Sequence, residues 1–343
     1  MACESNVKKL FILQKSGSQL NERIIKIKIY LRIFVTGSSG FLGSALVPGL
    51  LSRHHEVTAV VRREQDKSQT GSKSFVAGNI DAMTKWSKAL HGADVVIHLA
   101  ARVHVMRDSV SDPLAEFRRV NTEGTLNLAR QAATAGVRRF ICLSSIKVNG
   151  ETTVPNRPFT PNDLAAPQDP YGISKHEAEV GLREIACTTG MQVIIIRPTL
   201  VYGKGAKGNF KSLTKLVARG LPLPLGSINN LRSFVGIDNL VDFIITCLEH
   251  PAAANETFLV SDGEDLSTPD LIRRMARPMN RPARLLPVPV WALQAGASLL
   301  GKGDAVQRLC GNLQVDISKA RSLLGWVPPV SVDEGLRRAV GGG

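Results

Sequence analysis

A glycine-rich segment between an apolar run and a helical pattern constrains the fold of this chain more than any other feature. Residues 31–36 read LRIFVT, which predicts a buried strand, and residues 37–43 continue as GSSGFLG. Apolar residues between positions 45 and 51 then follow the spacing of a helix. A glycine triplet is a weak signal alone, but between a strand and a helix it indicates a dinucleotide-binding turn.

Each glycine of this turn has its own physical role. Gly37 permits the tight turn, Gly40 lets a pyrophosphate approach the backbone, and Gly43 lets the helix pack on the strand. The N-terminus of the helix turns its unpaired N–H groups toward the phosphates. We therefore predict cofactor contacts from Gly37, Gly40, Phe41, Leu42 and Gly43.

Further apolar runs alternate with helical segments along the chain. They cover residues 57–61, 74–77, 94–100, 139–144 and 192–197. Near-continuous apolar strands separated by helices are typical of a parallel sheet covered on both faces. We predict an α/β fold, a Rossmann-type doubly wound parallel sheet with a smaller C-terminal α/β substrate-binding lobe.

The expected domain boundaries follow the same pattern. We expect residues 1–28 to be a disordered extension, because no regular pattern starts before Leu31. Residues 29–200, with a returning segment at about 233–262, are expected to form the NAD(P)-binding domain. Residues 201–232 and 263–339 are expected to form the substrate-binding lobe.

Composition narrows the classes of partner. The formal charge of +14 is spread along the chain without aromatic interleaving, so an acidic small molecule explains it better than nucleic acid. No apolar run reaches the roughly 18 to 20 residues of a membrane span. The most apolar segment, residues 291–300, is expected to be a packed or partner-facing helix. The five cysteines are scattered, which predicts neither disulfides nor a metal site and fits a cytoplasmic protein.

Residues at the ends of the predicted strands indicate the cofactor. A dinucleotide-binding fold often has an acidic residue after its second strand that binds the ribose hydroxyls. This chain has Arg62 there, and an arginine can hold a 2′-phosphate, so we predict NADP, with NAD as the alternative. The other contacts expected at strand ends are Asn79, Ile80, Leu99, Ala100 and Ala101. His98 is expected to be a hydrogen-bonded core residue.

A tyrosine and a lysine on a predicted helix between the fifth and sixth apolar runs form a candidate acid/base pair. Tyr171 and Lys175 are four residues apart and therefore lie on one face of a helix, which Asp169 and Pro170 would begin. A nearby ammonium group favours the phenolate and lowers the tyrosine pKa toward neutral pH. Tyr171 is thus a candidate to exchange a proton with a hydroxyl or carbonyl group.

Together these motifs resemble the extended short-chain dehydrogenase/reductase family, in particular its nucleotide-sugar epimerase/dehydratase branch. The resemblance covers residues 31 to 339. The motifs that carry it are TGSSGFLG at 36–43, HLAA at 98–101, Asn121, Ser144 with Ser145, and the tyrosine and lysine of YGISK at 171–175.

The resemblance implies roles for individual residues. Ser145 matches the serine that hydrogen-bonds the substrate oxygen, Tyr171 the acid/base, and Lys175 the residue that lowers its pKa and holds the nicotinamide ribose. Asn121 matches a cofactor-proximal asparagine, and Pro198 matches the segment lining the nicotinamide. Asn209 and Arg232 match residues that bind the diphosphate of a nucleotide sugar. The resemblance also implies a homodimer formed through a four-helix bundle that includes the helix starting at Tyr171.

Departures from the family pattern favour one activity over another. Lys147 and Asn149 lie in SSIKVNG, where 4-epimerases commonly have Ser-Ser-x-x-Val-Tyr-Gly, and both are expected near the substrate. Ser233 and Gly236 replace an Asp and a His of the Arg-Asp-Phe-Ile-His pattern. With Arg62, these changes favour an enzyme resembling bacterial reductases of UDP-4-keto-6-deoxy-N-acetylhexosamines for surface polysaccharide. A UDP-hexose 4-epimerase is the alternative.

Three other functions are alternatives to the reductase and the epimerase. A dehydratase is disfavoured, because that branch has Thr-Asp-Glu where this chain has Ser145-Ile146-Lys147. A reductase of a sterol- or flavonoid-like ketone would also have an arginine after the second strand, but it would need neither Arg232 nor Asn209. A non-catalytic NADP-binding homologue is disfavoured by the intact Ser145, Tyr171 and Lys175.

Overall fold

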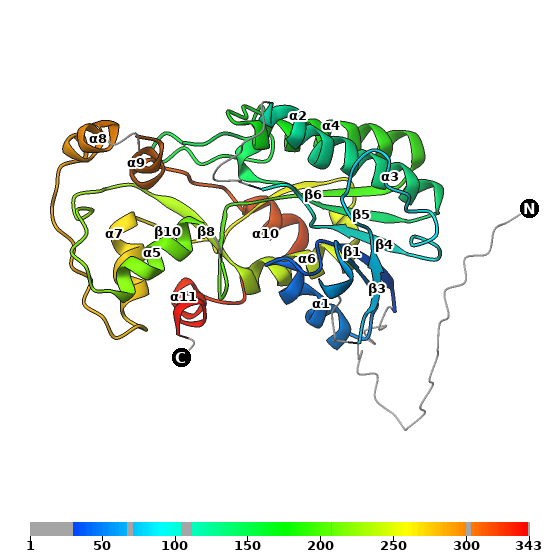
Figure 1. Cartoon of the computed structure of the whole chain (residues 1–343), viewed down its shortest axis with the longest axis horizontal. Helices are drawn as coiled ribbons and strands as arrows, with labels where there is room; N and C mark the ends of the chain where they lie inside the picture. Colours follow the sequence, from blue (N-terminus) through cyan, green and yellow to red (C-terminus); the bar gives the residue numbers. More distant parts are fainter. Residues whose placement is uncertain (1–29, 67–70, 104–111, 207, 300–302, 342–343) are drawn as a thin grey trace, which may run out of the picture.

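The computed structural model describes residues 30–66, 71–103, 112–206, 208–299 and 303–341. The expected extension at residues 1–28 lies outside these residues. Two sheets of different size organise the chain, and Figure 1 shows the larger one between layers of helices and the smaller one beside it. No helix among the residues described is long and apolar enough to cross a membrane.

The larger sheet has seven parallel strands in the order β3-β2-β1-β4-β5-β6-β9. Its strands are β1 (Arg32–Thr36), β2 (Glu56–Val61), β3 (Lys73–Val76), β4 (Val95–His98), β5 (Arg139–Leu143), β6 (Gln192–Pro198) and β9 (Thr257–Val260). This order is that of a doubly wound dinucleotide-binding sheet, so the predicted fold class is confirmed. All the strand C-termini lie at one edge of the sheet, where such folds bind ligands.

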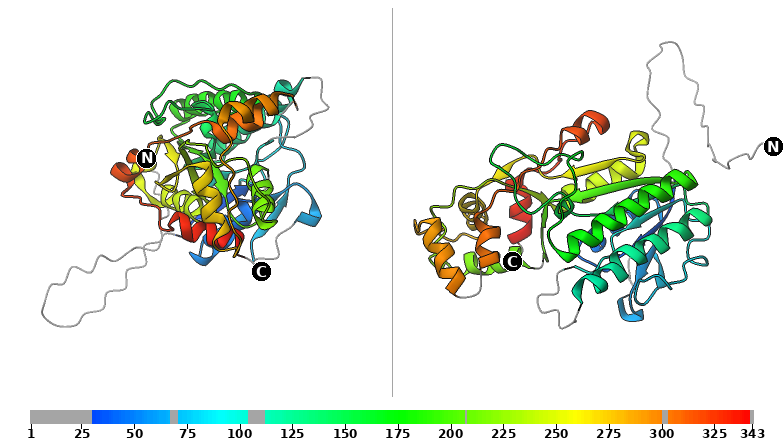
Figure 2. Two further views of the ribbon diagram at one scale, coloured as in Figure 1. Left: turned by 90° about the vertical axis from the view of Figure 1, so that its left-hand side faces the viewer. Right: turned by 90° about the horizontal axis from the view of Figure 1, so that it is seen from above.

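Helices cover both faces of this sheet, as Figure 1 shows. One face is covered by α1 (Gly43–Ser52), α6 (Ile237–Glu249) and α10 (Ser318–Leu324). The other is covered by α2 (Pro113–Phe117), a π-helix at Arg118–Glu123, α3 (Gly124–Thr134) and α4 (Pro170–Thr189). Short 3-10 helices cover Glu64–Asp66, Ile146–Val148 and Pro251–Ala253. The view from above in Figure 2 shows α3 and α4 side by side, and Gly181 of α4 fits directly against the Leu126 side chain of α3.

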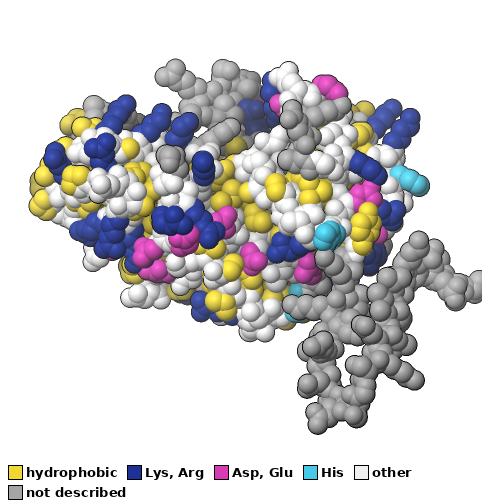
Figure 3. Space-filling model, turned by 90° about the horizontal axis from the view of Figure 1, so that it is seen from below, with side chains coloured by type: hydrophobic (Ala, Val, Ile, Leu, Met, Phe, Trp, Pro, Cys, Tyr) yellow, Lys and Arg dark blue, Asp and Glu magenta, His cyan; other side chains and the backbone are white. Residues whose placement is uncertain are grey.

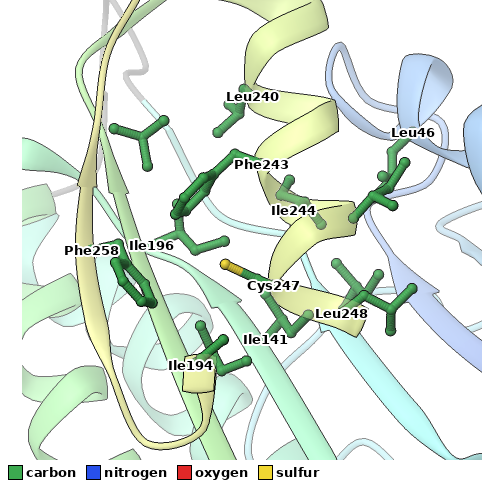
Figure 4. Close-up of a cluster of buried hydrophobic side chains, with 14 of the residues drawn as sticks. Leu46, Ile141, Ile194, Ile196, Leu240, Phe243, Ile244, Cys247, Leu248 and Phe258 are labelled. Atoms are coloured by element: carbon green, nitrogen blue, oxygen red, sulfur yellow. The ribbon is translucent and has the colours of Figure 1, made fainter. Parts of the chain in front are cut away.

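The core on the α6 side is built from branched aliphatic side chains of the strands and from the apolar face of that helix. Figure 4 shows Phe243 and Cys247 of α6 pointing toward Ile141, Ile194 and Ile196 of the sheet. Because both faces of the strands are covered, the strands are apolar almost throughout, which is the pattern in the sequence.

The smaller sheet and its helices form a lobe beyond the strand C-termini. Its strands run in the order β10-β8-β7, with β7 at Leu200–Tyr202, β8 at Arg232–Gly236 and β10 at Asp265–Leu266. The remaining helices are α5 (Asn209–Ala218), α7 (Thr268–Ala276), α8 (Val290–Leu299), α9 (Gly303–Cys310) and α11 (Val332–Val340). The chain enters this lobe after β6 and returns to the larger sheet with α6 and β9.

A buried hydrogen-bond network joins the two sheets. The Tyr202 hydroxyl donates to the Asp262 carboxylate at 2.7 Å, and the other oxygen of Asp262 accepts from the Gly236 amide and from Asn239. Tyr202 ends β7, Gly236 ends β8, and Asp262 follows β9. The network therefore fixes the smaller sheet against the end of the larger one. Gly335 lets α11 pack over the same tyrosine, because a Cβ there would lie 2.6 Å from the phenol oxygen.

Candidate active site

The glycine-rich turn follows β1 at the ligand-binding edge of the larger sheet. Gly37 has a φ of +69°, and a Cβ there would lie 2.8 Å from the Ala100 amide nitrogen. A Cβ on Gly43 would lie 2.2 Å from the Gly37 carbonyl oxygen, so only glycine allows α1 to start this close to the turn. Gly43 was predicted to let the helix pack on the strand, and in the structure it lets the helix pack against the glycine-rich turn.

The N-terminus of α1 fits a pyrophosphate. Its N-cap residue, Leu42, makes no side-chain capping bond, and no acidic residue lies in the first turn. No cap or first-turn side chain of α1 therefore neutralises the positive end of the helix, which leaves it open to an anion. Gly40 and Phe41 lie beside it, and the Gly40 amide is held by the Gly37 carbonyl oxygen at 3.0 Å.

The ends of the next strands line the same edge of the sheet. Arg62 and Asn79 are exposed after β2 and β3. Half-buried residues follow β3 and β4: Ile80, Leu99, Ala100 and Ala101. His98 is buried, and its ring nitrogens are bonded to Thr36 at 2.7 Å and Thr125 at 2.9 Å. Burial lowers the pKa of His98 to about 3, so it is a neutral core residue, as expected from the sequence.

Asn121 lies in the π-helix before α3 and is completely buried. Its side chain accepts from the Arg102 amide and donates to the Arg102 carbonyl oxygen and to Ser174. Arg102 follows β4, and Ser174 lies on α4 between Tyr171 and Lys175. The asparagine therefore ties a strand end of the cofactor edge to the helix that carries the acid/base pair. A single π turn at such a position is common at functional sites.

Tyr171 and Ser145 meet at the start of α4. The Asp169 carboxylate caps this helix by accepting from the Gly172 amide at 2.7 Å, and Pro170 occupies its first position, as predicted. Burial raises the pKa of Tyr171, while a hydrogen bond from Ser145 acts in the opposite direction. The lowered tyrosine pKa expected from Lys175 is therefore not found, because desolvation of the phenol outweighs the stabilisation of its anion.

Lys175 lies one turn further along α4. Its ammonium group donates to the Leu143 carbonyl oxygen at 2.8 Å, and only 2 % of the residue is exposed. Burial lowers the pKa of this lysine, while Cys142 and Glu179 act to raise it. The backbone bond to the end of β5 places the ammonium between the sheet and the helix.

A buried ion pair behind Lys175 was not anticipated from the sequence. Glu179, another turn along α4, accepts two bonds from the Arg197 guanidinium at 2.9 and 2.5 Å, and one from Ser144. Arg197 also donates to Asn149, which is 1 % exposed. Both ends of the Asn149 amide are bonded inside the protein, so this side chain holds the ion pair in place. Pro198, directly after Arg197, is buried at the end of β6.

Lys147, expected to contact the substrate, is held by two carboxylates. Its ammonium group pairs with Glu151 at 3.0 Å and with Asp169, the N-cap of α4. The lysine thus fixes the start of the helix that carries Tyr171. Its effect on a substrate would act through that helix as well as through any direct contact.

Arg232 and Arg308 lie close enough for the charge of one to act on the other. Arg232 at the start of β8 donates to the Gly311 carbonyl oxygen at 2.9 Å. Burial lowers the pKa of Arg232, the nearby charge of Arg308 lowers it further, and Glu151 raises it. Arg308 was missed in the sequence, since it lies on α9, 76 positions away, outside any motif. Asn209 is exposed in the first turn of α5.

The chain matches known proteins over most of its length. The NAD dependent epimerase/dehydratase family matches residues 33–261. A UDP-glucose 4-epimerase of Vibrio cholerae is 50 % identical over 308 residues, which are 89 % of this chain and 93 % of that protein. An N-acetyl-α-D-glucosaminyl-diphospho-ditrans,octacis-undecaprenol 4-epimerase of Escherichia coli O157:H7 is 29 % identical over 90 % of this chain and 94 % of its own.

A solved structure of the same kind of enzyme is also similar to this chain. The UDP-glucose 4-epimerase of Thermotoga maritima with UDP-glucose superimposes with a TM-score of 0.72 at 25 % identity, covering 90 % of this chain and 97 % of the other. The sequence identity, the match of the family and the seven-stranded sheet with its glycine-rich turn all lead to one assignment. This chain is an enzyme of the NAD dependent epimerase/dehydratase family, within the extended short-chain dehydrogenases/reductases.

Proposed function

We propose that the protein is a UDP-hexose 4-epimerase that uses NAD. The observation that carries the proposal is the 50 % identity to the Vibrio cholerae UDP-glucose 4-epimerase over nearly the whole chain, together with the Ser145, Tyr171 and Lys175 trio at the edge of the larger sheet. This identity supports the epimerase better than the 4-ketoreductase favoured by the sequence motifs.

The side chains support an acid/base mechanism at a sugar hydroxyl. Tyr171 removes the proton from the 4-hydroxyl and returns it after the keto sugar has turned, while Ser145 hydrogen-bonds the same oxygen. NAD held at the glycine-rich turn would supply reversible hydride exchange with C4 of the sugar. Lys175, held between sheet and helix by the Leu143 carbonyl oxygen, would bind the nicotinamide ribose. Burial raises the pKa of Tyr171, so the phenol is mainly protonated near neutral pH. The phenolate, which is the base, becomes more abundant as the pH rises, so oxidation of the hydroxyl should speed up with pH.

The proposed binding residues suit the pyrophosphate of the cofactor and the diphosphate of the UDP-sugar. Gly37, Gly40 and Gly43 with the start of α1 would hold the cofactor pyrophosphate. Arg232 and Arg308 would hold the diphosphate of the UDP-sugar, because two guanidinium groups close together favour an anion between them. We also propose that the protein is a homodimer formed through α3 and α4.

Arg62 supports a second candidate, the NADP-dependent 4-ketoreductase for surface polysaccharide. An exposed guanidinium after β2 suits a 2′-phosphate, whereas an epimerase that retains NAD does not need one.

The two candidates are separated on one purified sample. The protein is given UDP-galactose with NAD, and the formation of UDP-glucose is followed by chromatography. In parallel, NADPH absorbance is followed with a UDP-4-keto-6-deoxy-N-acetylhexosamine. Interconversion without net loss of reduced cofactor is the expected result. Stoichiometric loss of NADPH with no interconversion would replace the epimerase with the reductase.

A further inference from the structure

The outer end of the smaller lobe presents an exposed apolar helix. Trp291, Ala295 and Leu299 of α8 follow at a spacing of four and so lie on one face. Trp291 is 72 % exposed and Leu299 is 89 % exposed, whereas Ala297 on another face is buried. The helix has 10 residues, about half the length of a membrane span, so it can lie on a bilayer but cannot cross one.

The loops next to α8 add further exposed leucines and arginines. Residues 277–289 run along the outer edge of the lobe from α7 to α8 (Figure 1). The Leu223 amide donates to the Arg284 carbonyl oxygen and the Leu286 amide to the Leu223 carbonyl oxygen, both at 2.8 Å. These bonds bring the loop after α5 beside the loop before α8. Leu221 is 44 % and Leu286 49 % exposed on the two loops.

The two chain segments at this end of the molecule are rich in basic residues, of which Arg273 and Arg274 are paired with carboxylates. The sequence has no Asp or Glu between residues 185 and 237, nor between residues 271 and 303. Residues 204–232 contain six Lys or Arg, and residues 273–302 contain another six. Arg281 and Arg284 are exposed and form no ion pair within the described part of the chain. In Figure 3, Lys and Arg side chains surround hydrophobic ones at the lobe end, while Asp and Glu gather nearer the middle.

We propose that this end of the lobe docks on the surface of an anionic lipid bilayer. The docking surface consists of Leu221, Arg281, Arg284, Leu286, Trp291 and Leu299, and we call it the basic tip. Tryptophan favours the boundary between acyl chains and headgroups, where its ring is apolar and its N–H is hydrated. Exposed leucines insert beside it, and the arginines are attracted to anionic headgroups.

Charge distinguishes a bilayer from a second copy of the chain. Two copies that met through the basic tip would bring two acid-free, positively charged surfaces together, which disfavours association. An anionic membrane instead neutralises the arginines while it covers the apolar helix. The proposal does not depend on which sugar the active site binds.

Tryptophan fluorescence provides a direct test on the full chain. Of the three tryptophans, Trp86 and Trp326 are 0 % and 4 % exposed, so Trp291 dominates the emission from solvent-exposed indole. Phosphatidylglycerol/phosphatidylcholine vesicles should shift the emission to the blue, and lipids brominated on the acyl chain should quench it. Pure phosphatidylcholine vesicles should have much less effect, and about 0.5 M salt should reverse most of the binding, because it screens the headgroup charge.

Matched variants separate the charge and the apolar contributions. Arg281→Gln with Arg284→Gln should weaken vesicle binding about 25-fold, since each basic residue near an anionic surface contributes about fivefold. Arg53→Gln with Arg138→Gln, two exposed arginines on the larger-sheet side outside α3 and α4, should change it less than twofold. Leu299→Ser should weaken binding, whereas Leu164→Ser, at a site 93 % exposed elsewhere, should not. All variants should keep full activity on a soluble substrate.

Several results would overturn the proposal. One is a Trp291 emission that anionic vesicles leave unchanged, with no co-sedimentation. Another is equal weakening by the Arg53/Arg138 and Arg281/Arg284 pairs, which would indicate a nonspecific charge effect. A third is self-association in sedimentation velocity that Leu299→Ser abolishes, which would assign the basic tip to a second copy.

Discussion

The phenol of Tyr171 and the hydroxyl of Ser145 share a hydrogen bond, and the buried Lys175 lies one turn further along the same helix. Tyr171 and Lys175 could be singled out because their types and spacing form a local pattern, whereas Ser145 was assigned through the resemblance to the family. Lys147 and Asn149 could not be placed from the sequence, since their partners Asp169 and Arg197 come from distant positions. Arg308 was missed for the same reason.

Replacing Tyr171 tests the mechanism at this scale. Tyr171→Phe should lower kcat for 4-epimerisation at least about a hundredfold, because the proton acceptor is lost, while cofactor binding is kept. Tyr30→Phe is the matched control, since Tyr30 is 62 % exposed at the opposite end of β1. Steady-state rates and cofactor titration measure both. Equal activity of the two variants would remove Tyr171 from the mechanism.

The turn glycines give a second residue-scale prediction. Gly43→Ala should abolish cofactor binding and destabilise the fold, because its Cβ would meet the Gly37 carbonyl oxygen at 2.2 Å. Gly296→Ala in α8 is the control: nothing lies near its Cβ, so the change should be neutral or should stabilise by up to about 1 kcal/mol. Cofactor titration and urea unfolding check the pair. A Gly43→Ala protein that binds cofactor normally would contradict the packing argument.

At the scale of elements, α4 carries the acid/base pair and a buried anchor on one face. Tyr171, Lys175 and Glu179 follow every four residues, so the helix cannot shift along its axis without breaking the Glu179–Arg197 pair. Six strands of the larger sheet were predicted from the sequence to within two residues, because their apolar runs are long, whereas β9 was not predicted as a strand. The smaller sheet was not, since β7 and β10 have three and two residues. Such short strands leave no periodic pattern.

The anchor predicts a large loss of stability. Burial raises the pKa of Glu179, but the bonds and charge of Arg197 outweigh it and keep the pKa below its usual value. Glu179→Gln should leave the Arg197 charge buried without its partner and cost about 3 to 5 kcal/mol. Glu184→Gln, exposed on the same helix, should change the free energy of unfolding by less than about 0.5 kcal/mol. Urea denaturation measures both, and similar values for the two variants would contradict an anchoring role.

For the whole molecule, buried polar groups between layers decide how stability responds to acid. His98 joins β4 to β1 and α3 through Thr36 and Thr125, and it is neutral in the folded protein. Its pKa is about 3 when folded and 6.5 in the unfolded chain. Between these values only the unfolded chain takes up the proton, so a fall in pH through this window favours unfolding.

The expected effect is measurable without a ligand. The unfolding free energy should fall as the pH drops from 6.5 toward 3, with a His98 share on the order of 4 kcal/mol at the acid end. His98→Gln should be less stable at pH 7 but should lose less stability on acidification. Urea unfolding at several pH values compares the slopes. An unchanged slope in the variant would show that other groups, such as the buried His55, control the response.

The position of β9 also has a consequence for how the protein is made. This strand completes the larger sheet by pairing with β6, yet it follows the whole excursion of the chain through β7, α5 and β8. During synthesis, β6 therefore leaves the ribosome with one edge unpaired for about sixty residues, and an open strand edge favours pairing with other chains. A nascent chain stopped near residue 230 should aggregate, whereas one released beyond residue 261 can close its sheet. The synthesis of β9, rather than the early folding of the glycine-rich turn, thus determines when the open edge of β6 is covered.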